Sequence, residues 1–178
     1  MHMKQFLLTL FVVLVFTTPI WGAPSDPLEG ICGRKIQYNT DSANLAWEVD
    51  TAAHILKITG SGPMRDYDTD TRAPWYPWRK FIQKVKFPSG MTTVGDYAMY
   101  SLQELTDIDW TQNSKVETIN YGAFCYCTSL PKLELPNSLS SIEPYAFYHC
   151  DSLKSVTMGE NVSVIDSYAF EGCSGLTS

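Results

Sequence analysis

Apolar residues recur with a period of about 23 residues along the second half of the chain. Each copy opens with the pattern apolar-x-x-apolar-x-apolar, and the four copies begin at Ile82, Leu105, Leu130 and Leu153. Near the end of this hexad, apolar and other residues alternate as they do in a strand with one buried face. We therefore predict one short strand in each copy.

Further apolar features repeat with the same period. After each hexad come an apolar pair at i and i+3, then a small residue followed by Phe or Met, and three residues later Leu or Cys. The pairs are Met91/Val94, Val116/Ile119, Leu139/Ile142 and Val162/Ile165, the small residues are Ala98, Ala123, Ala146 and Ala169, and the last position holds Leu102, Cys127, Cys150 and Cys173. A period of about 20 to 29 residues with a Leu-x-x-Leu-x-Leu core is typical of leucine-rich repeats.

The fold class predicted from this period is a β-rich leucine-rich-repeat solenoid, with short parallel strands and one strand per coil. Residues 82–178 hold four copies and a truncated fifth that begins at Leu176. Such coils stack and share one continuous core, each contacting mainly its neighbours. Because the last copy is incomplete, we expect the chain to be a fragment of a longer array; a frayed terminal coil, or one covered by a partner, is the alternative.

Residues 23–81 are predicted to be a linker and an N-terminal cap. Two strand-like runs, at 45–49 and 55–59, are separated by a polar stretch, which predicts a β-hairpin. The Gly-Ser-Gly-Pro sequence at 60–63 predicts a turn directly after the hairpin. A cap of this kind would cover the apolar end of the first coil.

Residues 1–22 have the composition of a secretory signal peptide. Lys4 precedes an apolar run from Phe6 to Phe16, and small residues follow before the preferred cut between Gly22 and Ala23. The run is too short for a membrane-spanning helix, which needs about 20 residues, and no second apolar run of that length follows. The mature chain is therefore expected to be secreted or on the cell surface, and the sequence leaves its mode of anchoring open.

The five cysteines allow two interpretations. Cys127, Cys150 and Cys173 occupy the same position of successive coils, which favours an inward-facing ladder of small apolar side chains. A disulfide between neighbours in this ladder is compatible with the coil spacing but not required. Cys32 and Cys125 lie outside the ladder, and the odd count leaves at least one free thiol in a monomer.

Residues suited to catalysis or metal binding are scarce. None of the histidines, His2, His54 and His149, has a further ligand at the spacing of a zinc site. Asp66-x-Asp68-x-Asp70 resembles the start of a calcium loop, but Thr71 stands where that loop needs Gly and Pro77 where it needs Glu. We predict no enzymatic activity, no cofactor and no metal site.

Three other features bear on the surface chemistry and the choice of partner. The net charge of -6 argues against nucleic acid as a partner. The aromatic segment Trp75-Tyr76-Pro77-Trp78 could stack on sugars, although packing within the cap is the preferred interpretation. Asn161-Val162-Ser163 matches the acceptor pattern for N-glycosylation.

The repeats also carry a family resemblance. The spacing Ile-x-x-x-Ala-Phe-x-x-Cys-x-Ser-Leu, seen from Ile119 to Leu130 and from Ile142 to Leu153, resembles the BspA-like leucine-rich repeats of bacterial and protist surface proteins. The first copy departs from the pattern, with Met99 for Phe and Leu102 for Cys. The resemblance implies a secreted or surface-displayed interaction protein without catalytic residues; some members bind host or matrix proteins, or other cells.

The candidate binding surface is the outer face of the repeat strands. Side chains alternate along a strand, so the positions between the buried ones of each hexad should face solvent. These are Lys84, Lys86, Asp107, Asp109, Lys132, Glu134, Ser155 and Thr157. They would bind an extracellular protein or glycan, unless they are simply solvated. The alternative functions are an N-terminal accessory module of a larger secreted enzyme and a structural spacer.

Overall fold

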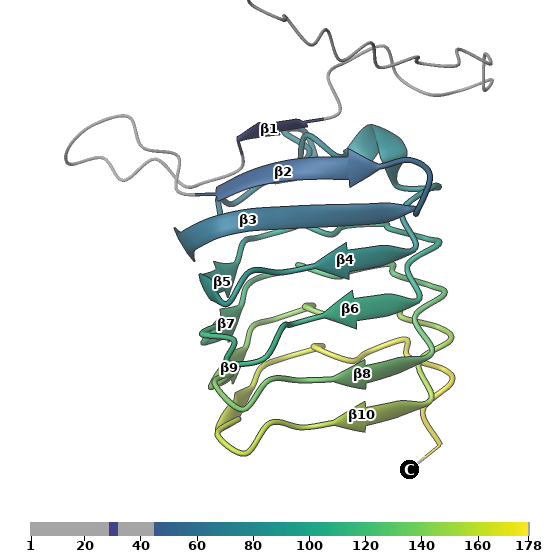
Figure 1. Cartoon of the computed structure of the whole chain (residues 1–178). Coiled ribbons are helices and arrows are strands. Elements are labelled where there is room, and N and C mark those ends of the chain that lie inside the picture. Colours follow the sequence, from purple (N-terminus) through teal and green to yellow (C-terminus); the bar gives the residue numbers. More distant parts are fainter. Residues whose placement is uncertain (1–28, 32–44, 178) are drawn as a thin grey trace, which may run out of the picture.

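The computed structural model describes residues 29–31 and 45–177, which form a solenoid of stacked coils beneath a β-hairpin (Figure 1). The predicted signal peptide and Cys32 lie outside the described residues. The elements are β1 (Glu29–Ile31), β2 (Leu45–Asp50), β3 (Ile55–Pro63), the 3-10 helix η1 (Tyr76–Trp78), β4 (Lys84–Lys86), β5 (Gly90–Val94), β6 (Asp107–Asp109), β7 (Thr118–Ile119), β8 (Lys132–Glu134), β9 (Ser141–Ile142), β10 (Ser155–Thr157) and β11 (Val164–Ile165). The predicted solenoid of short parallel strands with an N-terminal hairpin is confirmed. Within the described residues, no helix has the length and apolar character needed to cross a membrane.

The hairpin of β2 and β3 starts both strand ladders of the solenoid. β2 pairs with β3 in antiparallel fashion, and the carboxylate of Asp50 accepts hydrogen bonds from the amides of Ala52 and Ala53 in the turn. The first part of β3 pairs in parallel with β4, and its last part pairs with β5. The turn predicted at residues 60–63 is therefore wrong. Gly60 and Gly62 adopt φ values of 104° and 91°, and the strand continues through them with a bulge before Pro63.

Each coil has three sides. One side carries β4, β6, β8 or β10, and the next carries β5, β7, β9 or β11, with parallel pairing between coils. The third side is a chain of turns whose amides donate to carbonyls of the following coil. In the first repeat, for example, the Met99 amide donates to the Ala123 carbonyl at 2.7 Å and the Ser101 amide to the Cys125 carbonyl at 2.8 Å. The coils are thus joined by backbone hydrogen bonds on the turn side as well.

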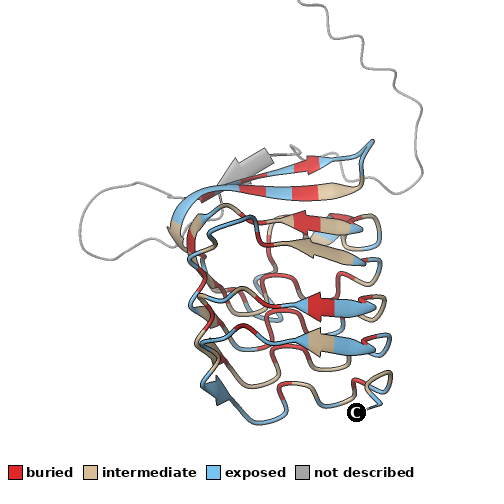
Figure 2. Ribbon diagram, turned by 60° about the horizontal axis from the view of Figure 1, so that its bottom comes forward, coloured by how far each residue is buried: buried red, intermediate tan, exposed pale blue. Residues whose placement is uncertain are grey.

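Buried residues line the inside of the coils and exposed residues the outside (Figure 2), except in the last coil, where Met158 and Ile165 of the repeat pattern are exposed. Phe124, Phe147 and Phe170 stack along the axis, with ring centroids 5.1 and 5.2 Å apart and planes 6° from parallel. Trp75 and Trp78 are buried against Trp47, so packing within the cap is confirmed for the two tryptophans of the aromatic segment. The core is therefore continuous from the cap through the stacked coils.

The cysteine ladder faces inward, as the period predicts. Cys125, Cys127, Cys150 and Cys173 are buried free thiols. The thiol of Cys150 donates to the Phe124 carbonyl at 3.5 Å, and the equivalent bonds of Cys127 and Cys173 reach the preceding coil at 3.2 and 3.1 Å. Burial raises the pKa of Cys125 to about 12. These thiols act as small core residues with a weak donor.

Candidate ligand-binding face of the repeat sheet

The strands on the first side of each coil place their central residue inward and their flanking residues outward. Val85 and Leu133 are buried, whereas Lys132 and Glu134 are exposed and Lys84 is partly exposed. Pairing aligns the flanking residues of neighbouring coils in register: Lys84 with Asp107, Lys86 with Asp109, Lys132 with Ser155, and Glu134 with Thr157. The sequence-predicted candidates therefore share one face of the molecule.

Ion pairs hold most of the charges on this face. The ammonium of Lys84 lies 2.5 Å from the Asp107 carboxylate and 3.8 Å from that of Asp109. The ammonium of Lys132 donates to the Glu134 carboxylate at 2.8 Å on the same strand. The hydrogen bond to Asp107 raises the pKa of Lys84, and the one to Glu134 raises the pKa of Lys132. Both ammonium groups are therefore charged at neutral pH and unsuited to act as general bases.

The ladder on this face is interrupted between the second and third coils. β6 pairs with β4 and β8 pairs with β10, but β6 and β8 are not hydrogen-bonded to each other in the described structure. At the other two junctions, the Thr106 amide donates to the Gln83 carbonyl of the preceding coil, and the Lys154 amide donates to the Pro131 carbonyl. Pro131 occupies the equivalent position and has no amide hydrogen. Proline at this position therefore removes a bond that would join the two strands.

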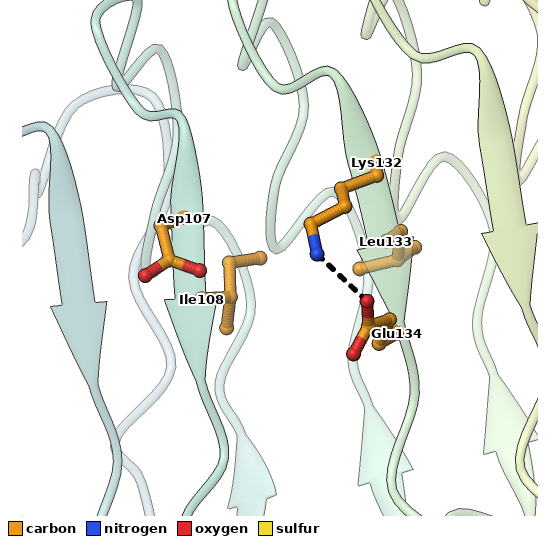
Figure 3. A pocket seen from close by; sticks show the side chains of 5 residues that line it. All are labelled: Asp107, Ile108, Lys132, Leu133 and Glu134. Carbon is orange, nitrogen blue, oxygen red and sulfur yellow. Dashed lines mark hydrogen bonds and ion pairs between the residues drawn. The ribbon is translucent and has the colours of Figure 1, made fainter.

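A hollow opens at this interruption (Figure 3). It has a volume of about 40 Å³ and lies between Asp107 and Ile108 of β6 and Lys132, Leu133 and Glu134 of β8. Figure 3 shows Lys132 and Glu134 linked across the β8 side of the hollow, with the Asp107 side chain on the β6 side.

A shallow, solvent-open depression of about 390 Å³ adjoins the hollow. It is lined by Lys84, Asp107, Ile108, Asp109, Trp110, Thr111, Gln112, Glu134, Leu135 and Pro136. The lining residues that follow β6 and β8 were not predicted from the sequence. The longer spacing of the second copy, 25 residues against 23, together with Pro131, is the signal that could have located them.

The remaining predicted residues lie outside the hollow and the depression. Lys86, Ser155 and Thr157 line neither of them. Asn161 is exposed in the turn between β10 and β11, where its side-chain amide donates to the Asn137 carbonyl at 2.7 Å. Among residues 29–31 and 45–177, no three His, Cys, Asp or Glu side chains are grouped so as to hold a metal ion.

A comparison with protein families identifies the repeat region. The model of the BspA type leucine rich repeat region matches residues 78–177 in six copies. A search of curated proteins gave no match.

Solved structures with a similar fold are bacterial leucine-rich repeat proteins. The T. pallidum leucine rich repeat protein is 20% identical over 77% of this chain and 68% of that chain, with a TM-score of 0.57. A leucine-rich repeat protein from Bacteroides ovatus is 17% identical over 79% of this chain and 46% of that chain, with a TM-score of 0.46. A leucine rich cell surface protein from Faecalibacterium prausnitzii is 18% identical over 75% of this chain and 46% of that chain, with a TM-score of 0.44. The chain thus spans less than half of the last two proteins.

Proposed function

The chain belongs to the BspA-type leucine-rich repeat family, and from this premise we propose that it binds an extracellular protein or glycoconjugate through the face formed by β4, β6, β8 and β10. The observation that carries the proposal is the interruption between β6 and β8. It places a solvent-open depression beside fixed charges of both signs, Lys84, Asp109 and Glu134 among them. Complementary charges of this kind favour the correct partner over others.

The chemistry of the face supports binding rather than catalysis. A catalytic lysine needs a pKa lowered towards neutrality, whereas the pKa values of Lys84 and Lys132 are raised by their carboxylate partners. The depression is also broad and shallow rather than the enclosed apolar pocket typical of small-molecule sites. We therefore place its partner among macromolecules. Secretion or display on the cell surface fits this role, supported by the signal peptide predicted at residues 1–22.

A binding screen tests the proposal. The mature chain, residues 23–178, is assayed against purified extracellular matrix proteins and a glycan array, beside a face variant with four alanine substitutions. The face variant carries Lys84→Ala, Asp109→Ala, Lys132→Ala and Glu134→Ala. A control variant removes two lysines and two glutamates that are exposed elsewhere, with Lys115→Ala, Glu117→Ala, Lys154→Ala and Glu160→Ala.

The proposal requires a ligand that binds the mature chain and the control variant but not the face variant. Circular dichroism and the urea midpoint show whether each variant is folded. A ligand that binds both variants equally would contradict the assignment of the face. If no ligand binds any of the proteins, the alternatives of an accessory module or a spacer are favoured instead.

A further inference from the structure

Eight of the ten tyrosines form one continuous surface strip on the third side of the coils. We call it the tyrosine strip; its members are Tyr76, Tyr97, Tyr100, Tyr121, Tyr126, Tyr145, Tyr148 and Tyr168. One row runs from Tyr97 through Tyr121 and Tyr145 to Tyr168, with ring centroids 5.5, 5.4 and 5.1 Å apart. A second row joins Tyr76, Tyr100, Tyr126 and Tyr148 at 6.2, 5.8 and 5.6 Å. The rows touch where Tyr97 meets Tyr100 and where Tyr145 meets Tyr148.

The strip is exposed and held on a rigid backbone. Tyr121, Tyr126 and Tyr168 are 39%, 37% and 56% exposed, and the other five rings are partly buried. The amides of Tyr97 and Tyr126 donate to the next coil at 3.0 and 2.8 Å. A rigid array of exposed tyrosines offers a large contact area with little loss of side-chain entropy on binding.

Several of these tyrosines occupy unfavourable backbone conformations. Tyr97, Tyr145 and Tyr168 have φ values of 50°, 59° and 61°, in the left-handed region that disfavours bulky residues. Glycine stands at the equivalent position of the second coil, Gly122, where φ is 57°. Because glycine suits this conformation better, the backbone does not require tyrosine here. Strain kept at partly or fully exposed positions points to a function for these side chains.

Two arginines lie at the cap end of the strip. The guanidinium carbon of Arg72 is 4.9 Å from the centre of the Tyr76 ring and 4.4 Å from that of Tyr100, and Arg79 is 4.4 Å from Tyr76. Neither arginine forms an ion pair within 4.0 Å in the described residues. Nη1 of Arg72 is buried without a hydrogen-bond acceptor.

Asp68, which interacts electrostatically with Arg72, already accepts hydrogen bonds from the backbone. Asp68 accepts hydrogen bonds from the amides of Thr71 and Asp70, and these bonds, more than Arg72, hold the pKa of Asp68 below its usual value. Nη1 of Arg79 donates to the Tyr76 carbonyl at 3.5 Å, and Nη1 of Arg72 is buried. The other guanidinium nitrogens of the two arginines are the donors left for an external carboxylate, which fits their planar fork. An acidic side chain lies further along the strip, because Asp151 pairs with His149 at 3.2 Å and the His149 ring contacts Tyr126 and Tyr148.

The contacts between neighbouring tyrosine rings favour a protein over a sugar as the partner. Sugars stack on open aromatic faces, but here each ring meets a neighbouring ring in a stacked, tilted or edge-to-face contact. These contacts cover part of the aromatic faces and leave ring edges and hydroxyl groups for a ligand, which suit protein surfaces. We propose that the tyrosine strip is a second binding surface, distinct from the sheet face, for a protein segment whose carboxylates bind Arg72 and Arg79.

Selection from a random 12-residue peptide display library, on the purified mature chain, tests this proposal. The selected peptides should be enriched in Asp and Glu. Their affinity should fall at least about tenfold for the double variant Arg72→Gln/Arg79→Gln, because charge-assisted bonds are lost. They should bind normally to Lys115→Gln/Lys154→Gln, which removes two exposed lysines elsewhere, and to the sheet-face variant described above.

The opposite results would overturn the proposal. These are peptides without an excess of acidic residues, equal affinity for the arginine variant, or no selected peptide at all. A second variant, Tyr121→Ser/Tyr126→Ser, should also weaken binding, and its urea midpoint shows whether it is folded. A glycan that binds the mature chain but not this folded tyrosine variant would likewise overturn the choice of a protein partner. Because the sheet-face variant is assayed in parallel, failure here is distinguishable from failure of the proposed function.

Discussion

Truncating Phe147 to alanine should destabilise the solenoid far more than the same change at Phe170. Phe147 is fully buried and stacked on both sides, whereas Phe170 is partly buried and stacks on Phe147 alone. Replacing a buried Phe by Ala costs about 3–5 kcal/mol, and two stacked pairs place Phe147 near the top of that range. For Phe170 we expect about 2 kcal/mol, from part of the burial and one stacked pair.

Urea unfolding followed by tryptophan fluorescence measures both values. With a slope of about 2 kcal/mol per M, the two variants should differ in midpoint by about 1 M or more. Phe147→Leu serves as the control, because it keeps most of the buried apolar volume and should lose much less. Equal losses at the two positions, or a loss below about 1 kcal/mol for Phe147→Ala, would refute the argument that the phenylalanine stack stabilises neighbouring coils.

Three further predictions concern the backbone, the tyrosines and the thiols. Pro131→Thr supplies the missing amide, so hydrogen exchange at β6 and β8 should slow. The free energy of unfolding should change little. The new hydrogen bond contributes about 1 kcal/mol, and the greater entropy of the unfolded chain without proline costs about 0.4–1 kcal/mol. Unchanged exchange would show that Pro131 does not cause the interruption. Burial raises the pKa of Tyr97 to about 12. The stability that comes from burying this phenol in its neutral form should be fully present below pH ~10 and should be lost as the pH rises towards 12. Absorbance at 295 nm should show a tyrosine that ionises late in the folded chain but not in urea. Burial raises the pKa of Cys125 to about 12, so Cys125 should react slowly with a thiol reagent at pH 8 and rapidly in urea. Peptide mapping identifies the labelled cysteine, and fast labelling of Cys125 in the folded chain would contradict its burial.

The repeat period was enough to predict the solenoid, the inward cysteine ladder and the strand residues that face outward. These features follow from the alternation of side chains within each copy, which the stacking of coils preserves. The interruption between β6 and β8 was not predicted from Pro131. Its effect depends on which carbonyl of the neighbouring coil its amide would have met, and that pairing appears only in the folded coil.

The tyrosine strip was missed for a related reason. Local preferences argue against tyrosine in the left-handed region, yet the amide of Tyr145 donates to Ser167 of the next coil and so holds it there. The same applies to the strand that continues through Gly60 and Gly62, where pairing with β5 overrides the turn preference of glycine. In each case the coil-to-coil hydrogen bonds, not the local sequence, determine the conformation.

The interruption at Pro131 also affects the mechanics of the solenoid. β7 and β9 remain paired across the same junction, and the turn side keeps bonds such as that from the Phe124 amide to the Ala146 carbonyl. A bend that separates β6 from β8 therefore breaks no backbone hydrogen bond between those two strands, whereas the same bend between β4 and β6 would have to break the bonds of a paired ladder. We therefore expect bending at the junction of the second and third coils to meet less backbone resistance than bending at the junction before it, and such a bend would change the width of the depression beside Asp109 and Glu134.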